Sequence, residues 1–372
     1  MDLPNVYESK NYKRLAVIPI VLFLAALAII FVRGIPQGVD LRGGVLLSVQ
    51  TNDHVDIAEL KSAVEKVARI SSIRTFASPG GTGVEIEVES NEKLVGLEEK
   101  VKALQIKDTQ LRELEVNATT ATNTGEVKAY LEKQAELNAE VVSISRDILK
   151  ALESEYAGNE GHVAVKLAVE KFGASQDDYR KAIISAISSK ISIKSYSFRE
   201  VGPALSKFFL VKSQEILLFS FLLSAIVVFI VFRSLIPSLA VISGAVNDIV
   251  ITIGIMSLFG IPLSLASIAG LLMLIGFSLD TDVMLTMRVL KRKEDTPAKR
   301  AFGAFKTGAL MNLTSIGAFT VLALAGLYLQ IPVYFELGIV AVIGSCVDFV
   351  ATWCLNAVLI LNHAEKKSKQ MT

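Results

Sequence analysis

Six apolar stretches along the chain are long enough to cross the hydrocarbon core of a membrane, which takes about 20 helical residues. The first follows Lys10, Lys13 and Arg14 and runs into Arg33 with no small-residue cleavage site, so it predicts a retained anchor and not a signal peptide. The pattern predicts an α-helical polytopic membrane protein, with helices two to six within residues 215–361. The stretches are 15–32, 215–232, 235–259, 263–286, 307–329 and 333–361.

The segment between the first two stretches, residues 33–214, has the mixed pattern of a folded domain. Its predicted elements come in the order strand, helix, strand, helix, strand. This order predicts an α+β sandwich of ferredoxin-like type, with its base at about 35–90 and 176–210. The elements are strands at 43–52, 83–90 and 191–198 and helices at 56–70 and 178–188.

A helix-rich insertion is expected at about 91–175 within this domain. Its residues 125–157 form a long polar helix with few apolar positions, which suits a mobile head or a contact surface. The boundaries at 90–91 and 173–177 are polar or contain glycine. We expect them to act as pivots between the insertion and the sandwich.

The composition agrees with a membrane protein and removes several function classes. Hydrophobic residues make up 52% of the 372 residues and charged residues 20%, and the mean hydropathy is +0.49. Because 38 basic residues nearly balance 37 acidic ones, no overall positive field favours nucleic acid as a partner. Cys346 and Cys354 lie about 12 Å apart along one apolar helix, and the histidines are scattered. We therefore expect no disulfide, no metal site and no cofactor.

The basic residues of the short loops predict the orientation. Residues 287–306 hold seven basic residues against two acidic ones, which is typical of a cytoplasmic loop. Arg233 and the basic tail alternate with the uncharged turns in the same sense. Both termini, residues 1–14 and 362–372, are then cytoplasmic, and the 33–214 domain is extracytoplasmic. The expected location is the plasma membrane.

Carboxylates within the apolar stretches are the candidate functional residues. Asp248, Asp280 and Asp348 lie in the third, fourth and sixth stretches, and no Lys or Arg lies at comparable depth. An unpaired charge there costs about 2.5 to 3.5 kcal/mol, so each carboxylate needs a partner, a cavity or a proton. We predict a proton or ion relay through these three residues. The expected intramembrane polar partners are Asn247, Asn312 and Thr314.

Asp282 is expected at the membrane interface. It lies two residues from Asp280, about 200° around a helix, so the two cannot face one pocket. It also lies only six residues from Arg288, near the end of its stretch. For Asp248 and Asp348 the alternative is a purely structural one, in which they hydrogen-bond to polar groups of neighbouring helices.

Motifs in a fixed order carry a family resemblance. GVDLRGG at 38–44 is followed by VGPALS at 201–206, by the polar-punctuated segment 245–283 and by NLT at 312–314. Together they resemble the SecD/SecF protein-export family of the resistance-nodulation-division superfamily. Leu279-Asp280 resembles the Val-Asp pair of SecD, whereas SecF has Asn-Asp there, so SecD is the closer match. The unusual insertion resembles the archaeal branch.

The resemblance implies a role in protein export. The family assists late translocation on the outer face of the membrane by a motion that the proton gradient drives. The implied partners are a SecF-like second six-span subunit, the Sec translocation channel, the unfolded exported polypeptide and membrane lipids. Paired glycines adopt backbone angles that other residues do not, so the motif is a candidate hinge, or alternatively a tight turn. Its residues are Gly38, Asp40, Gly43 and Gly44.

Two other functions fit parts of the pattern. An exporter of lipids or small molecules from the same superfamily would share the six spans and Asp280, but it usually has two six-span halves. An intramembrane aspartyl protease needs a GxGD motif, and here Asp280 follows GFSL. The sequence also lacks a phosphate-binding loop and HExxH, so we expect that the protein is not an enzyme.

Overall fold

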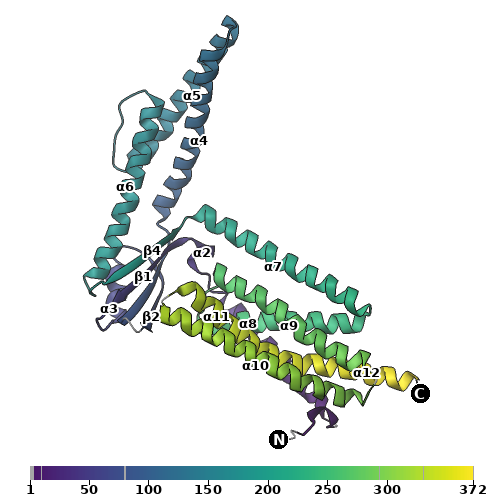
Figure 1. Cartoon of the computed structure of the whole chain (residues 1–372). Helices are drawn as coiled ribbons and strands as arrows, with labels where there is room; N and C mark the ends of the chain where they lie inside the picture. Colours follow the sequence, from purple (N-terminus) through teal and green to yellow (C-terminus); the bar gives the residue numbers. More distant parts are fainter. Residues whose placement is uncertain (1–3, 10, 79–80, 293, 330, 372) are drawn as a thin grey trace. The chain divides into compact units, whose positions relative to one another are not determined.

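The computed structural model describes residues 4–9, 11–78, 81–292, 294–329 and 331–371 (Figure 1). The chain divides into two compact units. The bundle unit contains residues 1–43, 76–80 and 204–372, and the sheet unit contains residues 44–75 and 81–203.

Within the described residues, six helical segments of the bundle unit are long and apolar enough to cross a membrane. This confirms the six spans expected from the sequence. The third, fourth and sixth spans are about half buried, whereas the first, second and fifth are mostly exposed, so the former three form the centre of the bundle. The helices are α1 (Val17–Arg33), α7 (Pro203–Phe232), α8 (Leu235–Phe259), α9 (Leu265–Lys291), α10 (Pro297–Leu329) and α11 (Pro332–Ala351), which continues through a π-helical turn (Thr352–Asn356) into α12 (Ala357–Met371).

A tight turn joins α8 to α9. Helix α8 ends at Gly260, whose φ of 68° lies in the left-handed region that glycine tolerates. Helix α9 starts with a capping box, in which Ser267 N donates to Ser264 Oγ at 3.1 Å and Ser264 N donates to Ser267 Oγ at 2.6 Å. The two central helices are therefore connected by a short segment with satisfied backbone groups.

The sheet unit contains a four-stranded sheet in the order β2-β3-β1-β4 among its described strands. Strand β1 is antiparallel to β3 and β4, with Leu47 opposite Ile86 and Phe198. Helices α3 and α6 supply Leu60, Ile183 and Ile187 to the buried core of the sheet. The ferredoxin-like arrangement is confirmed. The elements are β1 (Gly44–Thr51), α3 (Ile57–Val64), β2 (Ile70–Ser78), β3 (Gly81–Val88), α4 (Glu92–Thr120), α5 (Thr124–Ala151), α6 (Gly161–Ser188) and β4 (Ser195–Val201).

The insertion is a set of long helices that packs around its own apolar core. Helices α4, α5 and α6 contribute Leu104, Ile148 and Phe172 to this core. Helix α6 runs unbroken from the insertion into the sandwich, so the pivot expected at 173–177 is wrong. Phe172 is buried on one side of that segment and Ile183 on the other, and this packing holds the helix continuous.

Candidate functional site

Polar residues line one face of each central helix at a spacing of four. Residues four apart lie on the same side of an α-helix, so each set forms a stripe. The side chains of all three stripes are buried. They form a polar layer inside an otherwise apolar bundle, which we call the acid network. Its members are Asp248 and Thr252 on α8, Ser278, Asp282 and Thr286 on α9, and Asp348, Thr352 and Asn356 on α11 and the π-helical turn.

Hydrogen bonds join the carboxyl groups of the network across the helices. Ser278 Oγ donates to Asp248 Oδ2 at 2.5 Å. Thr352 Oγ1 lies 2.8 Å from Asp282 Oδ1 and 3.0 Å from Asp348 Oδ1. Because a hydroxyl group has one proton, Thr352 donates to only one of these two acids at a time. The network thus has two alternative hydrogen-bond arrangements around one hydroxyl group.

The fifth span adds an amide to the network. Asn312 Nδ2 donates to Asp348 Oδ2 at 2.9 Å, and Thr281 Oγ1 donates to Asn312 Oδ1 at 3.4 Å. Asp348 therefore accepts from the Asn312 amide and, in one of the two arrangements, also from the Thr352 hydroxyl group. Of the three acids, Asp348 has the most hydrogen-bond donors within reach in the described structure.

The three acids of the network have no cationic partner among the described residues. None of the ion pairs among the described residues involves Asp248, Asp282 or Asp348, and their charges interact with one another. Asp248 Oδ1 and Asp282 Oδ2 are buried without a hydrogen-bond partner in the described structure. A buried carboxylate that lacks a cation and has one oxygen without a donor is costly in its charged form. This arrangement suits groups that take up and release protons.

Gly244 makes the close approach of α8 to α9 possible. A Cβ atom at this position would lie 2.5 Å from Asp282 Oδ2. Any side chain would therefore displace the Asp282 carboxyl group, and glycine is the residue that fits.

The structure brings together some of the expected site residues and separates others. Asp248 and Asp348 belong to the network, and Asn312 bonds to Asp348 as a polar partner. Asn247 is buried beside Asp248, and its Nδ2 has no hydrogen-bond partner in the described structure. Thr314 is exposed and donates to the backbone of its own helix, so it lies outside the network.

The expectation that Asp282 lies at the membrane interface is wrong. Its side chain is fully buried in the network, where its Oδ1 is one of the two acceptors within reach of Thr352 Oγ1. The spacing of four that links Ser278, Asp282 and Thr286 is the signal in the sequence that indicates this position.

Asp280 points away from the network's centre but lines a small cavity that reaches it. Asp280 is exposed on α9, as the 200° separation from Asp282 requires. The cavity has a volume of about 60 Å³, and its lining also includes Asn312, Ser315 and Asp348. This volume accommodates water, which needs about 10 to 15 Å³ of such space per molecule. Asp280 thus lies at a polar route from the bundle surface to Asp348.

The glycine motif is hydrogen-bonded to the turn between α8 and α9. Gly38 N donates to Leu263 O at 2.9 Å, and Leu263 N donates to Pro36 O at 2.7 Å. Asp40 follows in a short helix, α2 (Val39–Arg42), and its Oδ2 accepts from Leu265 N at 3.4 Å. The segment that precedes β1 is therefore bonded to the connection of the two central helices.

Two glycines then lead into the first strand with backbone angles that favour glycine. Gly43 and Gly44 have φ values of 84° and 134°. A Cβ atom on Gly44 would lie 2.3 Å from Val88 O, so this residue also permits the close pairing of β1 with β3. The observed geometry is that of a tight corner; motion at this corner remains a prediction.

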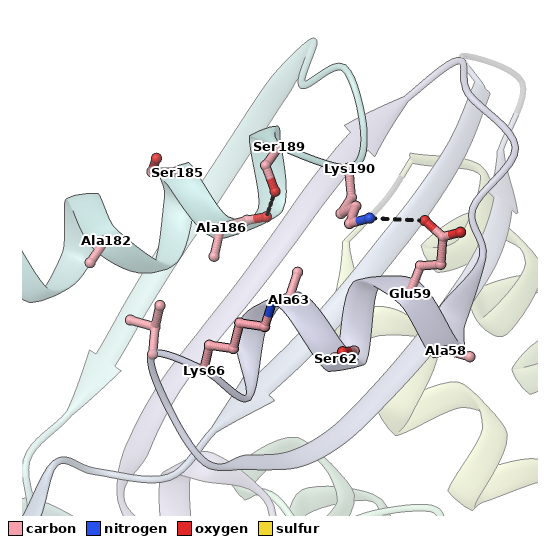
Figure 2. Close-up of a pocket in the computed structure, with 11 residues that line it drawn as sticks. Ala58, Glu59, Ser62, Ala63, Lys66, Ala182, Ser185, Ala186, Ser189 and Lys190 are labelled. Atoms are coloured by element: carbon pink, nitrogen blue, oxygen red, sulfur yellow. Dashed lines mark hydrogen bonds and ion pairs between the residues drawn. The ribbon is translucent and has the colours of Figure 1, made fainter.

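The sheet unit carries a separate open groove between α3 and α6, with a volume of about 880 Å³. Figure 2 shows the Ala and Ser side chains along its two helical walls and the ion pair of Lys190 Nζ with Glu59 Oε2 at 3.1 Å. Lys66, just after the end of α3, also lines the groove. These groups contain no pairing of a nucleophile with a base, so the groove gives no catalytic arrangement.

Comparison with known families and curated proteins gives consistent matches. The family described as "Protein export membrane protein SecD/SecF, C-terminal" matches residues 181–366, and the "SecD/SecF GG Motif" matches residues 28–53. The protein-export membrane protein SecF of Methanothermobacter thermautotrophicus is 41% identical over 200 residues, which cover 53% of this chain and 68% of the relative. SecF of Methanocaldococcus jannaschii is 27% identical over 354 residues, 94% of this chain and 95% of the relative.

A solved structure has a similar fold. The crystal structure of SecDF, a translocon-associated membrane protein from Thermus thermophilus, aligns with a TM-score of 0.51 at 14% identity. The alignment covers 95% of this chain and 59% of that longer chain. At this identity the likeness concerns the fold alone.

Proposed function

Because this chain belongs to the SecD/SecF family of protein-export membrane proteins, we propose that it is an accessory subunit of the Sec machinery that assists translocation of unfolded polypeptides across the cytoplasmic membrane. The family is a membrane component of protein export and not a family of enzymes. The SecD branch expected from the motifs is not confirmed, since the relatives described above are named SecF. We propose the SecF position, with a SecD-like six-span chain as its partner and the Sec channel beside them.

The acid network is the observation that carries the proposed mechanism. Asp248, Asp282 and Asp348 lie on three central helices. Protonation of Asp282 or Asp348 changes which of these two accepts the hydrogen bond from Thr352. One charge moved through 100 mV corresponds to about 2.3 kcal/mol. This energy is enough to bias two helix arrangements that differ by a few kcal/mol. The proton gradient is therefore the proposed energy source.

The hydrogen bonds between the glycine motif and the α8–α9 turn are the proposed connection by which a change in the acid network reaches the sheet unit. A shift of α9 against α8 moves the turn that holds Gly38 and Asp40 through its backbone. That segment continues directly through Gly43 and Gly44 into β1. A change in the acid network is thus passed to the start of the sheet by contiguous contacts. The basic segment 287–306, which spans the end of α9 and the start of α10, supports a sheet unit on the outer side.

The exposed face around Asp280 supports a second membrane subunit. A carboxylate that faces lipid is costly, and Asp280 is exposed in this chain. Helix α7 is also almost wholly exposed along its apolar length. A partner bundle that covers these surfaces would supply polar groups opposite Asp280 and complete the route to Asp348.

Isosteric neutralisation tests the mechanism. Asp282→Asn, Asp348→Asn and Asp280→Asn are each expressed as the sole copy, and export of a pulse-labelled secreted protein is measured along with membrane insertion. We expect normal insertion and reduced export, because Asn has nearly the same shape and cannot carry the proton. Asp295→Asn is the matched control, since Asp295 lies exposed in the loop after α9. Normal export in all three of these Asp→Asn variants would rule out the relay.

Copurification separates this function from the exporter alternative. Sec channel subunits that accompany the chain in mild detergent would support the export function. A bound lipid or drug-like cargo without such subunits would instead favour an exporter of small molecules.

A further inference from the structure

A groove on the bundle unit lies between α8 and α12. Its volume is about 480 Å³. One wall consists of Ile236, Leu239, Ala240 and Ser243 on α8, and the other of Leu359, Asn362, His363 and Lys366 on α12. Both sets have the spacing i, i+3, i+4, i+7, so each wall is one continuous face of its helix. We call this the α8–α12 groove.

The opposite face of α12 is already covered. Ala357, Ile360 and Leu361 are buried in the apolar cluster around Trp353. Leu239 and Ile236, in contrast, are 61% and 54% exposed on the groove side. The groove is thus an outer surface of the bundle whose α8 wall is largely apolar and whose α12 wall is largely polar.

The polar groups of the α12 wall, Asn362, His363 and Lys366, lie toward one membrane boundary. Successive spans reverse direction, so the start of the third span and the end of the sixth lie on the same side of the membrane. Lys366 closes the sixth span, and Arg233 stands directly before the third. No acidic residue lines the groove, and Glu365 faces Tyr12 on another side of α12.

We propose that the α8–α12 groove binds one anionic phospholipid. The hydrocarbon chains lie against Leu239 and Leu359, and the phosphate accepts hydrogen bonds from Lys366 Nζ and Asn362 Nδ2. Basic clefts between spans at a membrane boundary suit acidic headgroups, because a charge-assisted bond at that depth is only partly screened. A free phosphate ion would leave the exposed Leu239 and Leu359 side chains uncovered, so an apolar surface next to a basic residue favours a whole lipid. This site is independent of the proposed role in export.

The test uses the full chain in nanodiscs of phosphatidylcholine that contain a small fraction of phosphatidylglycerol, with native mass spectrometry of the lipids retained. We expect one phosphatidylglycerol to be retained in preference to phosphatidylcholine. Lys366→Gln should reduce this retention about fivefold, the change that corresponds to ~1 kcal/mol per basic residue. Leu239→Trp should also reduce it, because the indole fills the groove while the charges remain.

Lys306→Gln is the matched control. Lys306 is exposed near the start of α10, where its ammonium group lies over the Phe302 ring, outside the groove. An equal loss in this variant would show that surface charge alone retains the lipid, and the proposal would fail. Unchanged lipid retention in both groove variants would also overturn it. Loss of a copurifying membrane subunit in Leu239→Trp, with lipid retention unchanged, would show that the groove holds a protein helix instead.

Discussion

Gly244→Ala is expected to disrupt the acid network without changing any charge. The added methyl carbon would lie 2.5 Å from Asp282 Oδ2, about 0.9 Å closer than the 3.4 Å at which ordinary contact begins. Either the Asp282 carboxyl group rotates away from Thr352, or α8 moves away from α9. Both α8 and α9 are long helices with buried faces, so neither moves freely.

The two routes have similar costs. Overpacking of a tight core costs about 1 to 3 kcal/mol, and loss of a buried hydrogen bond costs about the same. Replacement of a helical glycine by alanine stabilises the helix by up to ~1 kcal/mol, because alanine has the higher helix propensity. We therefore expect Gly244→Ala to lower the free energy of unfolding by about 1 to 2 kcal/mol.

The measurement is denaturant unfolding of the full chain in detergent micelles, with Gly276→Ala as the matched control. Gly276 lies in mid-helix on α9 and has no atom within 4 Å of an added Cβ, so its variant should be neutral or slightly stabilised. The double variant with Asp282→Ala removes the opposing carboxyl group. In that background Gly244→Ala should lose its cost, which gives a coupling energy of about 1 to 2 kcal/mol.

Additive effects would refute the reasoning. If Gly244→Ala destabilises the protein equally with and without the Asp282 carboxyl group, to within about 0.5 kcal/mol, then the two groups do not meet as described. An equal loss in Gly276→Ala would point to a general intolerance of alanine in these helices.

Two further predictions concern the insertion. Burial lowers the pKa of His162, but hydrogen bonds to Asp108 and Glu115 raise it further, so the net pKa is above its usual value. The contribution of this contact to stability is therefore full below about pH 6.5 and lost as the pH rises through the raised pKa. Amide hydrogen exchange in α4, corrected for intrinsic rates, should be faster at pH 9 than at pH 5.5 in the wild type. The His162→Gln variant should show no such difference. Equal protection of the wild type at both pH values would contradict this prediction. Asn138→Ala should loosen the start of α6 by about 1 kcal/mol, since Asn138 Oδ1 accepts from Gly161 N at 2.8 Å, and unchanged exchange there would count against it.

The spans were predictable because membrane thickness sets their length. The positions of acids around a helix were harder to predict. Asp282 lies six residues from Arg288, and this closeness in sequence suggested the interface. Which face of α9 it occupies depends on packing against α8 and the π-helical turn, and only the stripe with Ser278 and Thr286 carries that information locally.

The sheet unit shows the same limit. Strand β2 was missed, because Ser71 and Ser72 and the charge of Arg74 interrupt its apolar pattern at the edge of the sheet. The polar segment after Gly173 suggested a break, yet α6 continues through it. Packing of Phe172 and Ile183 into two different cores overrides the weak local preference for helix.

The π-helical turn at Thr352–Asn356 sets the rotational phase of the last span. A π-helical turn contains an additional residue, and one residue corresponds to about 100° of rotation in an α-helix. Before the turn, Asp348 faces the centre of the bundle; after it, Ala357 and Leu361 pack inward and Lys366 faces out. Loss of a single residue within the turn would leave every later side chain on the wrong face. The number of residues here is consequently as constrained as their identity, and the last span behaves as two helices with independently fitted faces.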